Sequence, residues 1–170
     1  IEIVERALKQ YGAPVFVRLT AAQEPETGSP PPPDGIIAAA LGLEPGDIGA
    51  GGLSPILLSC GTPFLFVPVR EPSVLECISV DLDRWRAAFE NYDSSALFVF
   101  APGGELQYSD YSARMFAPLW GVPEDPATGS AATALGGHLA MRDQRVEASL
   151  SWTVEQGYAM GRPASCIWKR

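Results

Sequence analysis

The stretch EDPATGSAATALGGHL, Glu124–Leu139, combines side chains suited to acid–base chemistry with a backbone suited to binding an anion. Because a proline follows Asp125, we expect this residue to be extended or in a turn, directly before a helix. Gly129 allows an unusual backbone angle, and Thr128 or Ser130 can cap the first helical turn. A helix N-terminus carries unpaired N–H groups and a partial positive charge. The sequence therefore predicts a binding site for a carboxylate beside Asp125, called the anion seat below.

The helix behind this seat is made of small residues, Ala131 to Gly137. Its two adjacent glycines cost about 1–2 kcal/mol of helix propensity, so we expect burial at the centre of a sheet-wrapped lobe to offset them. Small side chains would also let strands approach the helix closely. The alternative is a capped core helix without any chemical role, since such caps are common.

Two further polar residues belong to this stretch. His138 is not a substitute acid or base, because it lies eight residues beyond Ser130, about 12 Å along the helix. It is interpreted as a packed or surface histidine. Glu124 is a candidate second carboxylate in the cleft, although neighbours at an extended turn tend to point apart.

Arg114 and the turn QGYAMGRP are further candidates. Arg114 could pair with a substrate carboxylate, but we favour a role in bracing its strand. In the turn, Met160, Gly161 and Arg162 either line the cleft or form a plain turn, and the sequence leaves both alternatives open.

Composition limits the classes of function. The chain has 170 residues, a hydrophobic fraction of 46% and a charged fraction of 19%, which is typical of one globular domain or two small lobes. A net charge of -8, with only 12 scattered Lys and Arg residues, argues against a nucleic-acid partner. No apolar run approaches the ~18 residues of a membrane span, so a soluble protein without a membrane partner is predicted.

The cysteines, Cys60, Cys77 and Cys166, are odd in number and widely spaced. This pattern fits neither a disulfide framework nor a metal site. We therefore predict reduced thiols, a cytoplasmic location and no bound metal.

Periodicity predicts an α+β fold with the final helix enclosed between strands in sequence. A proline-rich surface connector spans 21–35, and Asp34 and Asp81 are expected to cap the helices that follow them. The segment 1–10 could be a short helix in place of a strand. Strands are predicted at 1–5, 13–20, 53–60, 62–70, 74–80, 96–102, 106–118, 146–156 and 164–169, and helices at 35–43, at 81–92 and after the Asp125 turn.

Several blocks of the sequence resemble the PhzF-like (phenazine-biosynthesis-like) family, whose members adopt the diaminopimelate-epimerase fold. They are CGTPFLFVPV at 60–69, ARMFAP at 113–118, GVPEDPATGSAATALGGHLA at 121–140 and QGYAMGRPASCIW at 156–168. These blocks follow the family order over residues 53–168. The resemblance implies a curved, mostly antiparallel sheet wrapped around a central helix, with residues 53–170 as the C-terminal lobe and 1–52 as a crossover segment.

The resemblance also implies a chemistry. Family members place the active site between two similar lobes and move a proton next to a carboxylate, without a cofactor. By this resemblance Asp125 is catalytic, and Thr128, Gly129 and Ser130 bind the substrate. The family's main glutamate base and its supporting histidine belong to the N-terminal lobe and have no counterpart here. We therefore expect that base from upstream residues, a cleaved fragment or a second chain, and expect this chain alone to be inactive.

Two other functions are weighed against this isomerase or epimerase. A noncatalytic anion-binding or assembly module would keep the seat and lack the chemistry. A two-thiol racemase, as in the epimerases that share the fold, is disfavoured because no cysteine lies at the helix start. An apolar lobe face left uncovered would favour a first lobe or a homodimer as partner.

Overall fold

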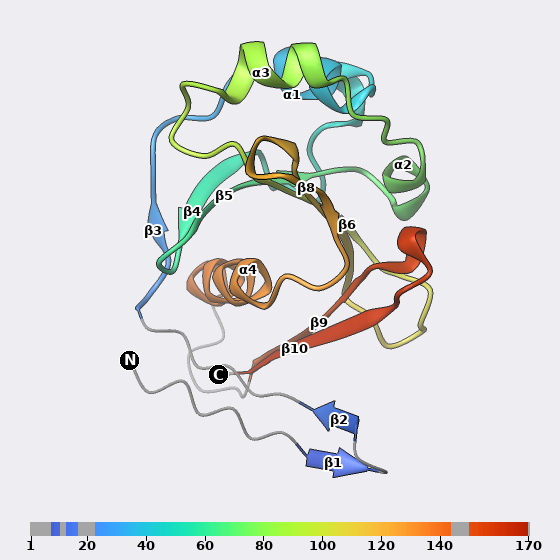
Figure 1. Ribbon diagram of the computed structural model, residues 1–170. Helices are drawn as coiled ribbons and strands as arrows, with labels where there is room; N and C mark the ends of the chain where they lie inside the picture. The colour runs from blue at the N-terminus through green and yellow to red at the C-terminus, as the bar shows by residue number, and fades with distance from the viewer. Residues whose placement is uncertain (1–7, 11–12, 17–22, 144–149, 170) are drawn as a thin grey trace.

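A computed structural model describes residues 8–10, 13–16, 23–143 and 150–169. At its centre lies α4 (Gly129–Arg142), and a strongly curled sheet wraps around it (Figure 1). Three shorter helices, α1 (Asp34–Leu41), α2 (Pro72–Glu76) and α3 (Leu82–Phe89), lie on the outer side of the sheet. The predicted α+β architecture is thereby confirmed.

The sheet has eight strands, in the order β10-β9-β7-β6-β5-β4-β3, with β8 paired to β7. The β5/β6 and β7/β9 pairs are parallel and the others antiparallel, as predicted for a mostly antiparallel sheet. The strands are β3 (Glu26–Thr27), β4 (Ile56–Ser59), β5 (Pro63–Pro68), β6 (Leu97–Pro102), β7 (Tyr111–Ala117), β8 (Val122–Asp125), β9 (Ser151–Gln156) and β10 (Ala164–Lys169).

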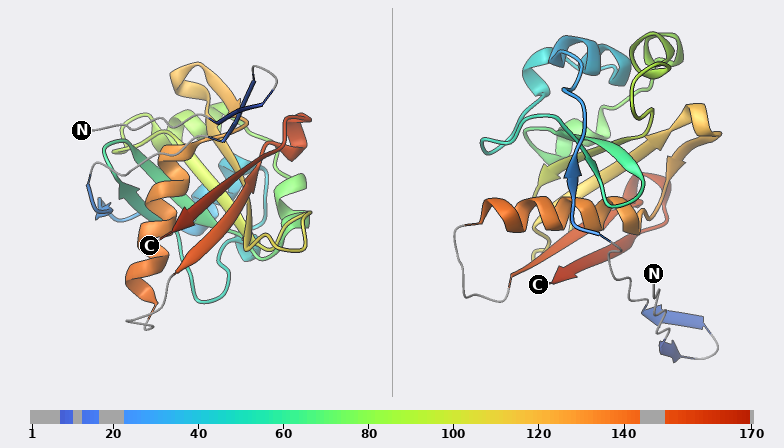
Figure 2. Two further views of the ribbon diagram at one scale, coloured as in Figure 1. Left: turned by 90° about the horizontal axis from the view of Figure 1, so that it is seen from below. Right: turned by 90° about the vertical axis from the view of Figure 1, so that its left-hand side faces the viewer.

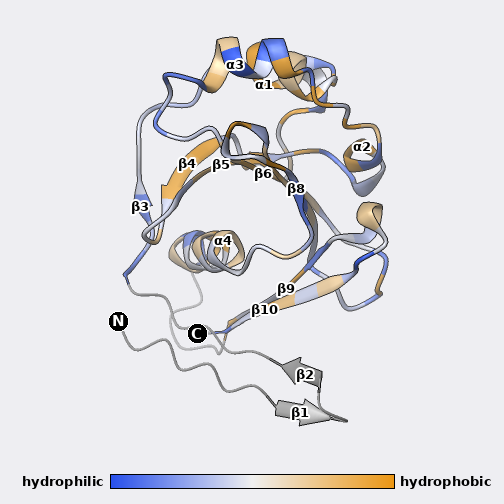
Figure 3. Ribbon diagram, viewed as in Figure 1, coloured by the Kyte–Doolittle hydropathy of each residue, from blue (hydrophilic) through white to orange (hydrophobic). Residues whose placement is uncertain are grey.

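The central strands are apolar on both faces because each face covers a separate core. Along β5, Phe64 and Phe66 join the core around α4, whereas Leu65 and Val67 join the core under α1 and α3. Figure 3 shows the hydrophobic character of β4, which belongs to the same layer. Continuous apolar runs are typical of strands covered in this way.

The glycines of α4 permit the close approach predicted from the sequence. A Cβ on Gly136 would lie 2.2 Å from the Trp168 ring, and one on Gly137 would lie 2.5 Å from Pro25. Trp168 belongs to β10, at one end of the sheet, and Pro25 precedes β3, at the other. Both ends of the sheet therefore close onto α4, which also packs against β9 and β4 (Figure 2).

Several local predictions need correction. The strand expected at 74–80 is wrong, because α2 begins at Pro72 and buries Val74 and Leu75 on one helical face. Proline favours the first turn of a helix, where its missing N–H costs nothing. Asp81 caps α3 as predicted, accepting hydrogen bonds from two backbone N–H groups. Asp34 instead lies inside the first turn of α1, after Pro33 as N-cap.

The remaining differences concern element ends. Residues 106–110 belong to a loop, so the strand predicted from 106 begins only at Tyr111. Near the N-terminus β1 (Leu8–Gln10) pairs antiparallel with β2 (Ala13–Phe16), which contradicts a helix reaching residue 10. The predicted strand at 1–5 and the start of the one at 146–156 lie outside the described residues. No helix in the described part is long and apolar enough to cross a membrane.

Candidate functional site

Asp125 is the last residue of β8, which pairs with β7 and leads into α4. Its carboxylate is half-buried, and its Oδ2 accepts a hydrogen bond of 2.6 Å from the Thr128 hydroxyl. The extended conformation expected before Pro126 is therefore present. The pair of Asp125 and Thr128 lies directly at the start of α4.

Gln156, at the end of β9, holds this turn in place and is 2% exposed. Its Nε2 donates to the Asp125 carbonyl at 2.6 Å and to the Thr128 Oγ1 at 2.9 Å. Its Oε1 accepts from the Thr128 N–H at 3.0 Å. Sequence reasoning missed this residue, and its only signal was its place directly before the glycine of QGYAMGRP.

The network fixes the direction of the hydroxyl hydrogen bond. Because Gln156 donates to the Thr128 oxygen, the Thr128 proton is left to point at Asp125 Oδ2. The other carboxylate oxygen, Oδ1 of Asp125, has no hydrogen-bond partner among the described residues. Asp125 is thus oriented through Oδ2, while Oδ1 is not engaged by any described residue.

The start of α4 is not capped by a side chain, which corrects the expectation for Thr128 and Ser130. Thr128 is the N-cap residue but turns its hydroxyl to Asp125. Within the described part of the chain, the N–H groups of Gly129 and Ser130 have no acceptor. Gly129 is half-buried and Ser130 is exposed, so this end of the helix is open. Free N–H groups at such a position favour an anion.

The turn after β9 lies against the Asp125 turn because Gly157 allows a close approach. Its φ is +82°, and a Cβ there would lie 2.7 Å from the Pro126 carbonyl oxygen. Met160 is half-buried, while Gly161 and Arg162 are exposed. The two turns thus meet at Gly157, and among the described residues none of these three hydrogen-bonds to Asp125.

Glu124 faces away from this network. Its two carboxylate oxygens accept from Nε and Nη2 of Arg114, each at 2.8 Å, and both side chains are largely buried. The Arg114 Nη1 donates to the Leu75 carbonyl, and the guanidinium lies over the Phe116 ring. Arg114 thus braces its strand, as favoured from the sequence, and neutralises Glu124.

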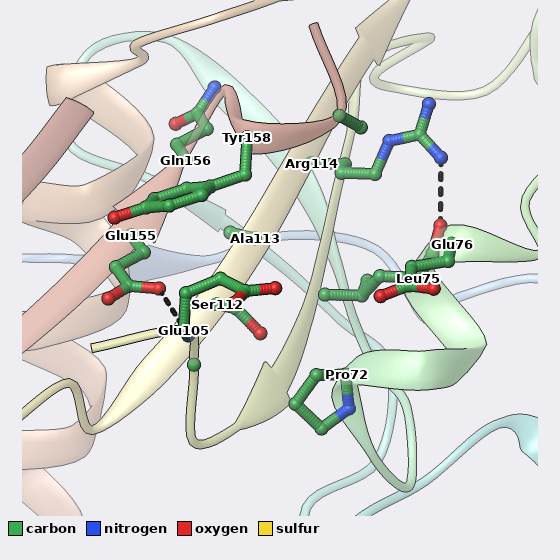
Figure 4. Close-up of a pocket in the computed structure, with 12 residues that line it drawn as sticks. Pro72, Leu75, Glu76, Glu105, Ser112, Ala113, Arg114, Glu155, Gln156 and Tyr158 are labelled. Atoms are coloured by element: carbon green, nitrogen blue, oxygen red, sulfur yellow. Dashed lines mark hydrogen bonds between the residues drawn. The ribbon is translucent and has the colours of Figure 1, made fainter. Parts of the chain in front are cut away.

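On the outer face of the sheet, directly behind Gln156, lies a pocket with Glu155 at its base (Figure 4). Glu155 is 1% exposed and accepts hydrogen bonds from the N–H groups of Glu105 and Leu106 and from the Ser109 hydroxyl. Consecutive strand residues point to opposite faces, so the Glu155 side chain lies on the pocket side and the Gln156 side chain on the α4 side, although Gln156 also lines the pocket. Neither was predicted as important from the sequence.

No hydrogen bond joins the remaining reactive side chains of the described residues to Asp125. Burial, and then the charge of Arg142, lower the pKa of His138 on α4. Burial raises the pKa of the Cys60 and Cys166 thiols, which makes both poorer nucleophiles. In the described ranges no three His, Cys, Asp or Glu side chains gather as metal ligands.

Comparisons with known proteins match the chain to one family and to several relatives. The family profile PhzC-PhzF, phenazine biosynthesis-like protein, matches residues 12–167. An uncharacterized isomerase of Mesorhizobium japonicum is 30% identical over 164 residues, covering 95% of this chain and 54% of that protein. A trans-2,3-dihydro-3-hydroxyanthranilate isomerase of Pseudomonas fluorescens is 40% identical over 104 residues, covering 61% of this chain and 34% of that protein.

A similar fold occurs in a crystal structure. The phenazine biosynthesis protein of the PhzF family from Bacillus anthracis superposes with a TM-score of 0.76 at 20% identity. The match covers 85% of this chain and 48% of that one. This chain therefore spans about half the length, or less, of the relatives it matches.

Proposed function

Because the chain belongs to the family of phenazine biosynthesis-like proteins, whose relatives include isomerases, we propose that it forms the Asp125 side of an isomerase or epimerase site. The proposed reaction moves a proton on a carbon next to the carboxylate of a small acid, without metal or organic cofactor. The observation that carries this proposal is the pairing of an oriented carboxylate with free N–H groups at the start of α4.

The proposed binding step uses the α4 terminus. The substrate carboxylate accepts hydrogen bonds from the N–H groups of Gly129 and Ser130, with the Ser130 hydroxyl and the Thr128 turn beside them. The partial positive charge of the helix then stabilises the negative charge that develops when the neighbouring C–H loses its proton. The preformed network around Gln156 supports this, because an oriented site needs no reorganisation during the reaction.

The proposed proton transfer needs two groups. A general base takes the proton from carbon, and the electron pair left behind delocalises toward the substrate carboxylate. Asp125 Oδ1 accepts this proton from the base and donates it to the acceptor carbon, so that both groups return to their starting protonation states. Glu124 is engaged with Arg114 and His138 lies about 12 Å along the helix, so we assign the principal base to a part of the protein outside this chain. The longer relatives support that assignment.

The test uses trans-2,3-dihydro-3-hydroxyanthranilate, the substrate named for three relatives. The protein, with any further segment its gene encodes, is incubated with this acid in D2O, and NMR follows isomerisation and deuterium incorporation. We expect turnover that Asp125→Asn lowers at least about 100-fold, the usual contribution of general acid–base catalysis. Asp83→Asn, an acid-to-amide change at an exposed site on α3, is the matched control and should keep full activity.

An unchanged rate in Asp125→Asn would contradict the catalytic role. Binding of the acid without isomerisation or exchange would favour the second candidate, a noncatalytic anion-binding module, which the free N–H groups of α4 also support. Inactivation by thiol alkylation would point instead to thiol chemistry.

A further inference from the structure

The pocket on the outer face lies between α2, β7, the loop after β6 and the turn after β9 (Figure 4). Its volume is about 70 Å³. A cavity of about 150 Å³ holds a benzene molecule, so this pocket accepts a group of about three to four non-hydrogen atoms. The apolar residues Pro72, Leu75 and Ala159 form part of its wall.

The charges around this pocket are unbalanced. Glu76 and Glu105 are exposed at its rim, and neither forms an ion pair with a described residue. Glu155 adds a third carboxylate at the base, which neutral N–H and O–H donors satisfy. The pocket therefore has an excess of negative charge.

The one cation in the wall does not offset this charge. The Arg114 guanidinium gives Nε and Nη2 to Glu124 and Nη1 to the Leu75 carbonyl. Its positive charge is thus matched by Glu124, which is not a carboxylate of the pocket wall. An anionic ligand would therefore find no net positive charge here.

A buried hydroxyl also lacks a partner. Ser112 Oγ lies in the pocket wall, is closed off from solvent, and forms no hydrogen bond in the structure. An unpaired buried polar group costs about 1–3 kcal/mol, so a ligand that satisfies it gains affinity. Oxygen of a hydroxyl is a good acceptor for an N–H donor.

An aromatic ring completes the wall. The Tyr158 side chain is 38% exposed, and Figure 4 shows its ring extending over Glu155. Desolvation raises the pKa of the Tyr158 hydroxyl, and the charge of Glu155 adds to that rise. Aromatic faces attract ammonium groups, especially where carboxylates lie nearby.

We propose that this pocket is a second binding site, separate from the Asp125 site, for a small primary amine in its ammonium form. The ammonium group enters between Glu76 and Glu105, donates to Ser112 Oγ and lies against the Tyr158 ring. Its short apolar chain contacts Pro72 and Leu75. The two sites lie back to back, because Gln156 contributes to the network on one face and to the pocket wall on the other.

The test is a titration of the 15N-labelled protein with n-propylammonium chloride, followed by NMR at constant ionic strength. Propionate and n-propanol, which have the same number of carbon atoms, are the anionic and neutral controls. We expect the amides of Glu105, Ala113 and Tyr158 to shift, with n-propylammonium binding at least about fivefold more tightly than n-propanol. Equal binding of amine and alcohol, tighter binding of propionate, or no shift at these residues would overturn the proposal.

Two variants locate the site. Glu76→Gln combined with Glu105→Gln should weaken amine binding about three- to tenfold, since exposed ion pairs contribute modestly. Glu90→Gln, at the exposed end of α3, is the matched control and should change nothing. Ser112→Ala should weaken amine binding without lowering thermal stability, because its hydroxyl has no partner to lose. Unchanged amine affinity in both pocket variants would contradict the assignment.

Discussion

Two carboxylates, on the two strands β8 and β9 that pair with β7, are held in different ways. Asp125, on the α4 side, is half-buried and has one oxygen fixed by Thr128. Glu155, on the outer side, is fully buried and has both oxygens saturated by three donors. Hydrogen bonding alone therefore does not distinguish a reactive carboxylate from a structural one. A carboxylate with a fixed orientation and a free oxygen can react, whereas a saturated one ties a loop to the sheet.

Matched acid-to-amide changes test this contrast most strongly. Glu155→Gln places an NH2 group against backbone N–H donors, so we expect it to lower the free energy of unfolding by about 2–4 kcal/mol. Asp125→Asn keeps an oxygen for the Thr128 hydroxyl and should cost about 1 kcal/mol or less. Urea unfolding of both variants measures the difference. Equal losses would show that the two carboxylates have the same structural role.

Gln156→Leu removes the amide that joins the two turns. It leaves the Thr128 N–H and the Asp125 carbonyl without their partner in a buried position. We expect a loss of about 2 kcal/mol in the free energy of unfolding and weaker binding at the α4 terminus. Gln107→Leu, on the exposed part of the loop after β6, is the control that should leave both unchanged. A stable Gln156→Leu variant with unaltered binding would contradict the role of this network.

Thr128→Val tests the hydroxyl that orients Asp125. The change preserves shape and removes one hydrogen bond, so we expect about 1 kcal/mol of lost stability. Turnover should fall more than stability, because Asp125 then rotates freely. Thr128→Ser restores the hydroxyl and should recover most of the activity. If Val and Ser variants behave alike, the hydroxyl does not position the carboxylate.

Substitution of His138 is expected to have the smallest effect on stability. It tests whether a change farther along α4 leaves the α4 terminus unaffected. Its pKa is lowered by folding, so the unfolded chain takes up the proton first as the pH falls. Its contribution to stability is complete above the ordinary histidine value of about 6.5 and is lost as the pH falls through the lower folded value. The free energy of unfolding of the wild type should fall between pH 7 and pH 5, and His138→Gln should lack this part of the pH dependence. The pH dependence of catalysis should remain as in the wild type.

The sequence predicts the elements whose signals are local. Each of three local signals predicts one kind of structure. They are the apolar runs of β5 and β6, the proline before the α4 turn, and the glycines at 136 and 137. The assignment to the PhzF-like family rests on the same blocks and is confirmed by the comparisons. The division at residue 53 and the homodimer remain predictions.

Contacts between distant residues could not be predicted in this way. Gln156 and Asp125 are 31 positions apart, and nothing in either neighbourhood shows that they meet. Glu155 looks like an ordinary solvent-facing residue of an alternating strand until the loop at 103–110 covers it. The strand predicted at 74–80 failed for a related reason, since its branched residues suit a strand and only Pro72 indicates a helix.

One titration tests the central claim most directly. Anthranilate, a stable aromatic analogue of the proposed substrate, is added to the 15N-labelled protein while the amide resonances of α4 are followed. We predict saturable shifts largest at Gly129 and Ser130, with little change at Leu139 or Ala140 farther along the helix. Shifts absent from Gly129 and Ser130 at saturating anthranilate would contradict an anion seat beside Asp125.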